Sequence, residues 1–229
     1  MLEGDRLSAQ GARFWARVLP LIALIGGGAL LSGFWLLRTV SLEWSLLTLA
    51  SVGSGVMMLS AARRRQGFLT APQWMLVASA LLMYVGLALD VSRDRVLAIS
   101  EVCSAAAPTI ASLDGWLRHV GAMPMMHAGM LAGGVAAIFI VRARARRSCR
   151  RALCARAGIN LLCSLAMLLG MYAGMVAFGV TARLTGLPWN GMAMLGGMVA
   201  GMVWAMLGLV RLYRYMFSWV DEEAVGLRA

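Results

Sequence analysis

The chain has 229 residues, of which 61% are hydrophobic, and its mean hydropathy is +0.77. A soluble domain needs a polar surface, so this composition excludes an ordinary soluble protein. It predicts a protein that is embedded in the lipid bilayer. All 21 basic residues are arginine and the formal net charge is +11. In a soluble protein such a charge would suggest nucleic acid binding. Here the arginines follow a membrane pattern, and no nucleic acid partner is expected.

Six apolar segments are long enough to form membrane spans. A spanning helix needs about 20 mostly apolar residues to cross roughly 30 Å of hydrocarbon. We therefore expect an all-α polytopic membrane bundle, with one transmembrane domain over residues 1–229 because no soluble stretch is long enough for a second domain. The predicted spans lie near residues 18–37, 42–61, 73–92, 119–141, 158–180 and 190–212.

The arginines fall on alternate connections between these segments. Sixteen of the 21 lie in the N-terminal tail, at 63–65, in the loop 142–156 or in the C-terminal tail. Because cytoplasmic loops carry an excess of arginine, this pattern predicts six transmembrane helices with both termini inside, in a cell inner membrane of bacterial type. The first apolar run is long and no clear A-x-A site follows it, so we expect a retained span rather than a cleaved signal peptide.

Methionines in the last three predicted spans recur at helical spacing. Twelve of the 18 methionines lie between residues 123 and 206. Steps of four residues place side chains on one face of a helix. The ladders are Met167, Met171 and Met175 in the fifth span and Met194, Met198, Met202 and Met206 in the sixth.

Both histidines of the chain fall on a similar stripe in the fourth predicted span. His119, Met123, His127 and Met130 follow at steps of four, four and three residues. On one continuous helix the two histidines would lie about 12 Å apart. This separation, and their place on a single helix, argue against a b-type haem held between them. Pro124 is expected to kink the helix and to free the carbonyl near Val120.

Thioether and imidazole groups are the soft, neutral ligands that suit Cu(I). The stripes therefore predict binding or passage of a soft metal ion, with His119 as an outer entry ligand and His127 as the principal ligand inside the membrane. The candidate metal ligands are His119, Met123, His127, Met130, Met171, Met175, Met194, Met198 and Met202.

Helix packing is the competing interpretation of the same pattern. Methionine fills irregular gaps, and each of the three helices also carries a pair of glycines four residues apart, which permits close helix contact. The glycine and methionine faces could pack within the chain. They could also bind partner helices, in a homo-oligomer or in a non-catalytic membrane subunit or assembly factor. The pairs are Gly129 and Gly133, Gly170 and Gly174, and Gly197 and Gly201.

The remaining polar residues indicate no further chemistry. No nucleophile with its base is visible, so an enzyme is not predicted. Asp90 lies at the outer end of the third span, where we expect it to face water, beside Arg93 or Arg95. The four cysteines form no C-x-x-C pair, so a disulfide scaffold is not expected. The first three spans are expected to be ordinary anchors.

Overall fold

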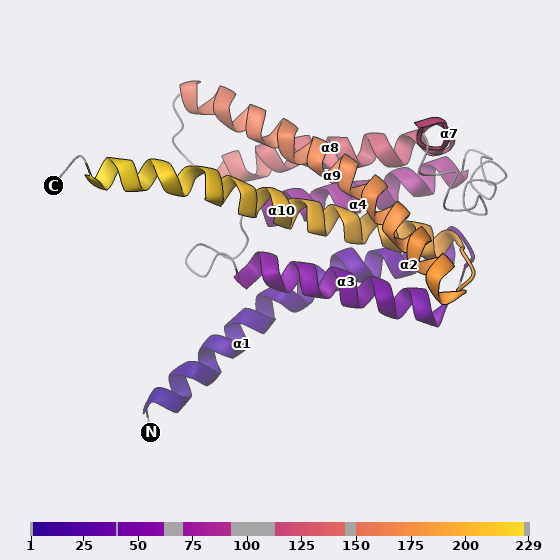
Figure 1. The fold of residues 1–229 in the computed structure, drawn as a ribbon, viewed down its shortest axis with the longest axis horizontal. Coiled ribbons are helices and arrows are strands. Elements are labelled where there is room, and N and C mark those ends of the chain that lie inside the picture. The colour runs from indigo at the N-terminus through magenta and orange to yellow at the C-terminus, as the bar shows by residue number, and fades with distance from the viewer. Residues whose placement is uncertain (1, 40, 62–70, 93–112, 145–149, 227–229) are drawn as a thin grey trace.

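The computed structural model describes residues 2–39, 41–61, 71–92, 113–144 and 150–226, and most of them are helical (Figure 1). Their apolar sequences suit helices, because in hydrocarbon a helix satisfies its own backbone hydrogen bonds. In chain order the elements are α1 (Leu2–Ile22), the π-helix η1 (Ala23–Gly27), α2 (Gly28–Trp35), α3 (Leu42–Ala61), α4 (Ala71–Ser92), α7 (Leu113–Ala122), α8 (Pro124–Arg144), α9 (Arg150–Thr185) and α10 (Gly191–Gly226).

Five described segments are long and apolar enough to cross a membrane, and a bent pair of helices would make a sixth crossing if it counts as one span. Each of them overlaps a predicted span, so the all-helical prediction is confirmed, with five or six candidate membrane-spanning helices. The five segments are Phe14–Trp35, Leu42–Ala61, Pro72–Ser92, Leu161–Thr185 and Gly191–Leu212; the bent pair is Asp114–Ala122 with Pro124–Ala137.

The fourth predicted span, 119–141, is not one continuous helix. The chain breaks at Met123, and α7 and α8 meet at an angle of 85°. Pro124 is the first residue of α8, a position where its missing N–H costs nothing and its fixed φ suits a helix start. The predicted kink is thus present, but it is large enough to divide the segment into two helices. In Figure 1, α7 lies across the end of the bundle while α8 runs along it.

Large apolar side chains cover the outside of these helices. Leu31 of α2 is 61% exposed and Leu169 of α9 is 68% exposed. Water would disfavour so many exposed apolar groups, whereas lipid tails would solvate them. The exposed faces therefore fit a lipid environment.

Four helices form a closed ring. Helix α4 packs along α8, α8 touches α9, α9 packs along α10, and α10 touches α4. The contacts within the pairs α4–α8 and α9–α10 are much more extensive than those between the pairs. We call the space between the two pairs the seam. Because α4 belongs to this ring, the expectation that the first three spans are plain anchors is wrong for the third.

Glycines allow the close approach within each pair. A Cβ atom on Gly129 or Gly133 of α8 would overlap backbone carbonyl oxygens of α4. On α9, a Cβ atom on Gly174 would overlap the carbonyl oxygen of Gly197 on α10, and one on Gly201 would overlap that of Gly170. The three predicted glycine pairs therefore pack against helices of the same chain.

Helix α10 also packs against elements outside the ring. It contacts α2, α3, α4, η1 and α9, and every residue from Gly191 to Ala200 is buried. The π-helix η1 leaves the carbonyl of Ile25 to accept a hydrogen bond from the hydroxyl of Tyr84 on α4. Helix α1 begins and α10 ends at the same end of the bundle, opposite to α7 (Figure 1).

Candidate metal site

The bend between α7 and α8 brings the two histidines into contact. The ring centroids of His119 and His127 lie 5.2 Å apart with the planes at 87°. The predicted separation of about 12 Å along a continuous helix is therefore wrong, because the chain turns at the bend instead of continuing along one axis. A large separation of the two histidines therefore does not exclude a haem between them. Rings in edge-to-face contact nevertheless leave no space for a macrocycle between them.

His127 has a fixed orientation. Its Nδ1 lies 2.7 Å from the carbonyl oxygen of Met123. A carbonyl only accepts hydrogen bonds, so Nδ1 carries the proton and Nε2 keeps its lone pair. Histidine ligands of metals are commonly oriented by a second-shell acceptor of this kind. The carbonyl beside this histidine is that of Met123, one turn before it, rather than that of Val120.

His119 is completely buried, and neither of its ring nitrogens has a hydrogen-bond partner within the described residues. A buried polar atom without a partner costs roughly 1–3 kcal/mol. This cost suggests that the imidazole is kept for a ligand. Met123, which lies between the two histidines in the chain, is also fully buried.

A carboxylate from α4 holds the start of α8. The Asp90 side chain accepts hydrogen bonds from the backbone N–H of Met125, at 3.2 Å, and of Met126, at 2.8 Å. These are N–H groups of the first turn of α8, which have no partner within the helix and which attract negative charge. Asp90 is fully buried, so the expectation that it faces water is wrong. Its suggested neighbours Arg93 and Arg95 lie outside the described residues.

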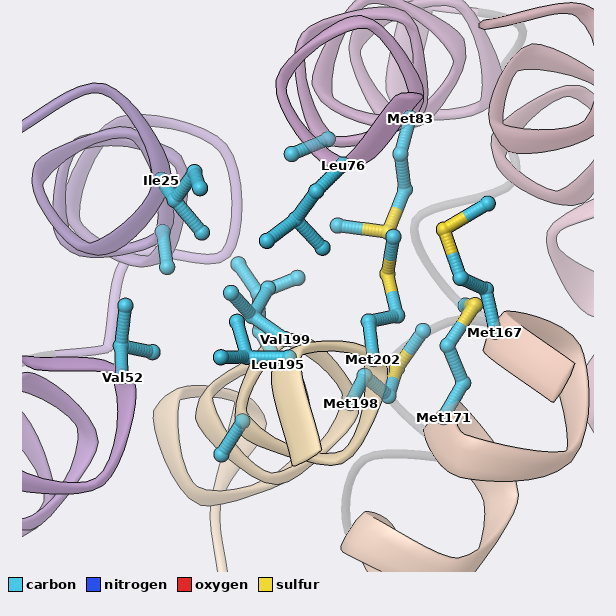
Figure 2. Close-up of a cluster of buried hydrophobic side chains, with 14 of the residues drawn as sticks. Ile25, Val52, Leu76, Met83, Met167, Met171, Leu195, Met198, Val199 and Met202 are labelled. Carbon is cyan, nitrogen blue, oxygen red and sulfur yellow. The ribbon is translucent and has the colours of Figure 1, made fainter. Parts of the chain in front are cut away.

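The methionine ladders face the interior. Met130 is fully buried on α8, and so is Met126, which is not among the predicted ligands. On α9 and α10 the predicted ligands are at most 2% exposed: Met171, Met175, Met194, Met198 and Met202. Met171, Met198 and Met202 turn into one space together with Met83 of α4 and Met167 of α9 (Figure 2). We call these five residues the seam cluster.

Met83 and Met167 are not among the ligands predicted from the sequence. Met167 belongs to the α9 ladder, whereas Met83 shares one face of α4 with Met75, eight residues earlier. The spacing of Met75 and Met83 was the sequence feature that could have indicated a methionine face on α4. Met175 and Met194 continue the α9 and α10 ladders by one turn toward the α7 end.

The available donors suit a soft ion better than a hard one. Within the described part of the chain, no three His, Cys, Asp or Glu side chains come together in an arrangement that would hold a metal ion. The groups that do gather are two imidazoles and several thioethers, which are neutral and favour Cu(I). No protein-family model, no curated protein and no solved structure matches this chain.

Proposed function

We propose that this protein binds Cu(I), or a soft ion like it, at His119 and His127 and passes it along the methionines between its helices. The observation that carries the proposal is the buried His119 imidazole, which has no partner among the described residues and touches a second imidazole with a free Nε2. A metal ion that accepts a lone pair from each ring would offset the cost of burying them.

The charge of the donors supports the choice of metal. Two imidazoles and thioethers bring no charge, so a bound Cu(I) ion keeps a single positive charge in the low-dielectric interior. The carboxylate of Asp90 lies at the backbone of Met125 and Met126, directly before His127. Its negative charge favours a cation at the α7 end of the seam.

The same donor set continues along α8. Met130 follows His127 by three residues, roughly 4.5 Å along the helix axis. Both side chains are buried on one face of α8. An ion released by the histidines would therefore meet a thioether next.

We further propose that the chain lies in an inner membrane with both termini inside. The arginine distribution supports this orientation. A membrane-impermeant thiol reagent applied to intact cells should then label Cys103, on a predicted outer loop, and spare Cys149, on the predicted arginine loop. Labelling of Cys149 without Cys103 would show that the chain has the opposite orientation.

The alternative is a subunit or assembly factor that binds partner helices through glycine and methionine faces. In this structure the described glycine pairs and methionine ladders pack against helices of the same chain. A partner would have to bind another surface. We therefore place metal binding first.

Metal analysis of the purified protein tests the proposal. The protein is loaded with Cu(I) under reducing conditions, freed of excess metal, and compared with a His127→Ala, Met130→Leu variant. A matched control is Met192→Leu, a buried methionine whose sulfur lies against Gly33 of α2 and away from the seam. We expect the double variant to lose the Cu(I) held at the histidines and so to retain less copper than the wild type, and the control to match the wild type. Equal, negligible copper in all three would contradict the proposal.

A further inference from the structure

We infer that the seam cluster is a second Cu(I) site, built only from thioethers, deeper in the bundle than the histidine pair. The inference depends on the proposed function for the identity of the ion. It adds a place where that ion rests after leaving the histidines.

Three helices supply the ligands of this second site. Met83 comes from α4, Met167 and Met171 from α9, and Met198 and Met202 from α10. Figure 2 shows these side chains turned toward the same space between the helices. Each of the five is at most 2% exposed, so neither water nor lipid solvates the sulfur atoms. Three thioethers from such a set would satisfy a Cu(I) ion, which accepts a low number of soft ligands.

The cluster lies on the path that begins at the histidines. A Cβ atom on Gly129 of α8 would lie 3.4 Å from the backbone nitrogen of Met83, so the two helices are in register at this level. Met130 follows Gly129 directly, and His127 is less than one turn nearer the α7 end. Met130 therefore connects the histidine pair with the seam cluster.

Polar groups lie on the other side of the cluster. A Cβ atom on Gly134 of α8 would lie 2.5 Å from the Ser164 hydroxyl and 3.6 Å from the Ser79 hydroxyl. Ser79 is fully buried, and its hydroxyl has no hydrogen-bond partner among the described residues. Ser79 precedes Met83 by four residues and Ser164 precedes Met167 by three, so both hydroxyls lie about one turn beyond the thioethers. The cluster thus has an unpartnered polar side chain at each end, His119 on one side and Ser79 on the other. Such groups are expected along a path for an ion, whereas in a core of packed side chains they would only lower stability.

The loose contact between the helix pairs also fits this role. The pairs α4–α8 and α9–α10 are held by backbone contact at glycines, whereas the flexible methionine side chains of the seam cluster lie between them (Figure 2). Methionine side chains can change rotamer without moving a helix, so an ion could exchange ligands from one thioether to the next.

A Cu(I) titration against a colorimetric competing chelator counts the sites. We expect two ions per wild-type chain, one in Met83→Leu, Met202→Leu, one in His119→Ala, His127→Ala, and two in the Met192→Leu control. Leucine has nearly the volume of methionine, so the seam should keep its packing while it loses sulfur. Thermal unfolding of each variant without metal checks that it folds.

The outcomes separate the two proposals. One ion in the wild type that only the histidine substitutions remove would overturn the second site and leave the proposed function standing. One ion that only the methionine substitutions remove would overturn the histidine site instead. Wild-type protein that contains selenomethionine provides a test without substitutions, because X-ray absorption of bound copper should show selenium neighbours from the seam cluster. Their absence in the His119→Ala, His127→Ala variant would overturn the second site.

Discussion

Replacing Gly201 by alanine tests the close contact that holds α9 against α10. A Cβ atom at this position would lie 2.7 Å from the carbonyl carbon of Gly170 and 2.9 Å from Cα of Gly174. Carbon atoms pack best about 3.5–4.0 Å apart, so the two helices would have to separate by roughly 1 Å. Both obstacles are backbone atoms, which cannot turn away as a side chain would.

The cost follows from two opposing effects. Overpacking costs typically about 1–3 kcal/mol, whereas a change from glycine to alanine favours the helix by up to about 1 kcal/mol. We therefore expect Gly201→Ala to lower the free energy of unfolding by about 1–2 kcal/mol. Gly208→Ala is the matched control, because Gly208 lies on the same helix and its Cβ would meet nothing within 4 Å.

The assay is reversible denaturant unfolding in detergent micelles, followed by circular dichroism. Gly201→Ala should unfold at lower denaturant concentration than the wild type, and Gly208→Ala should unfold at the same or a slightly higher concentration. Because Met198 and Met202 flank this position, Gly201→Ala should also weaken Cu(I) binding. Identical unfolding of both variants would refute the glycine contact between α9 and α10.

Three further substitutions test the polar contacts. His119→Leu should leave the metal-free protein as stable as the wild type or up to about 3 kcal/mol more stable, since a buried unpartnered imidazole is removed. Cu(I) raises the melting temperature by binding the folded state, and His119→Leu should abolish most of that rise. A clear loss of stability in the metal-free variant would contradict the view that His119 is unpartnered. Asp90→Ala should lower the free energy of unfolding by about 0.5–2 kcal/mol, because it removes the cap of α8. Asp90→Asn should lower it less, because asparagine also caps helices. Equal melting temperatures for the two variants would argue against a capping role. Tyr84→Phe should cost about 1 kcal/mol, because the Ile25 carbonyl loses the hydroxyl donor and keeps only the backbone N–H of Gly28. An unchanged melting temperature would show that the tyrosine hydrogen bond is not needed.

Composition and hydropathy were enough to predict the helical character of the chain and the positions of its five or six candidate membrane spans. Every described segment that is long and apolar enough to span a membrane had been located from its length and composition. The bilayer makes this inference strong, since it admits few kinds of backbone structure. Helical spacing likewise predicted that the methionine ladders would each lie on one face, and those faces are buried.

The geometry of the candidate site could not be predicted in the same way. Pro124 predicted a kink but not its size. The bend measures 85°, and at this bend the Asp90 side chain accepts hydrogen bonds from the backbone of Met125 and Met126. Asp90 is 36 residues from Met126 in sequence, so no local pattern predicts that contact. Helical spacing alone places the two histidines on one straight helix, whereas in the structure their rings are in contact.

The role of α4 was missed for a related reason. Its two buried methionines, Met75 and Met83, are too few to form a visible ladder. Only the pairing of α4 with α8 and its contact with α10 bring Met83 to the ladders of the later helices. Partner choice among helices depends on shape across the whole bundle, which spacing along one segment does not contain.

X-ray absorption at the copper edge tests the central claim most directly. The wild-type protein is loaded to saturation with Cu(I), and the same measurement is made on the His119→Ala, His127→Ala variant. The account predicts nitrogen scattering with the outer-shell pattern of imidazole in the wild type, together with sulfur scattering, and sulfur alone in the variant. A wild-type spectrum without imidazole, or a protein that retains no copper, would contradict it.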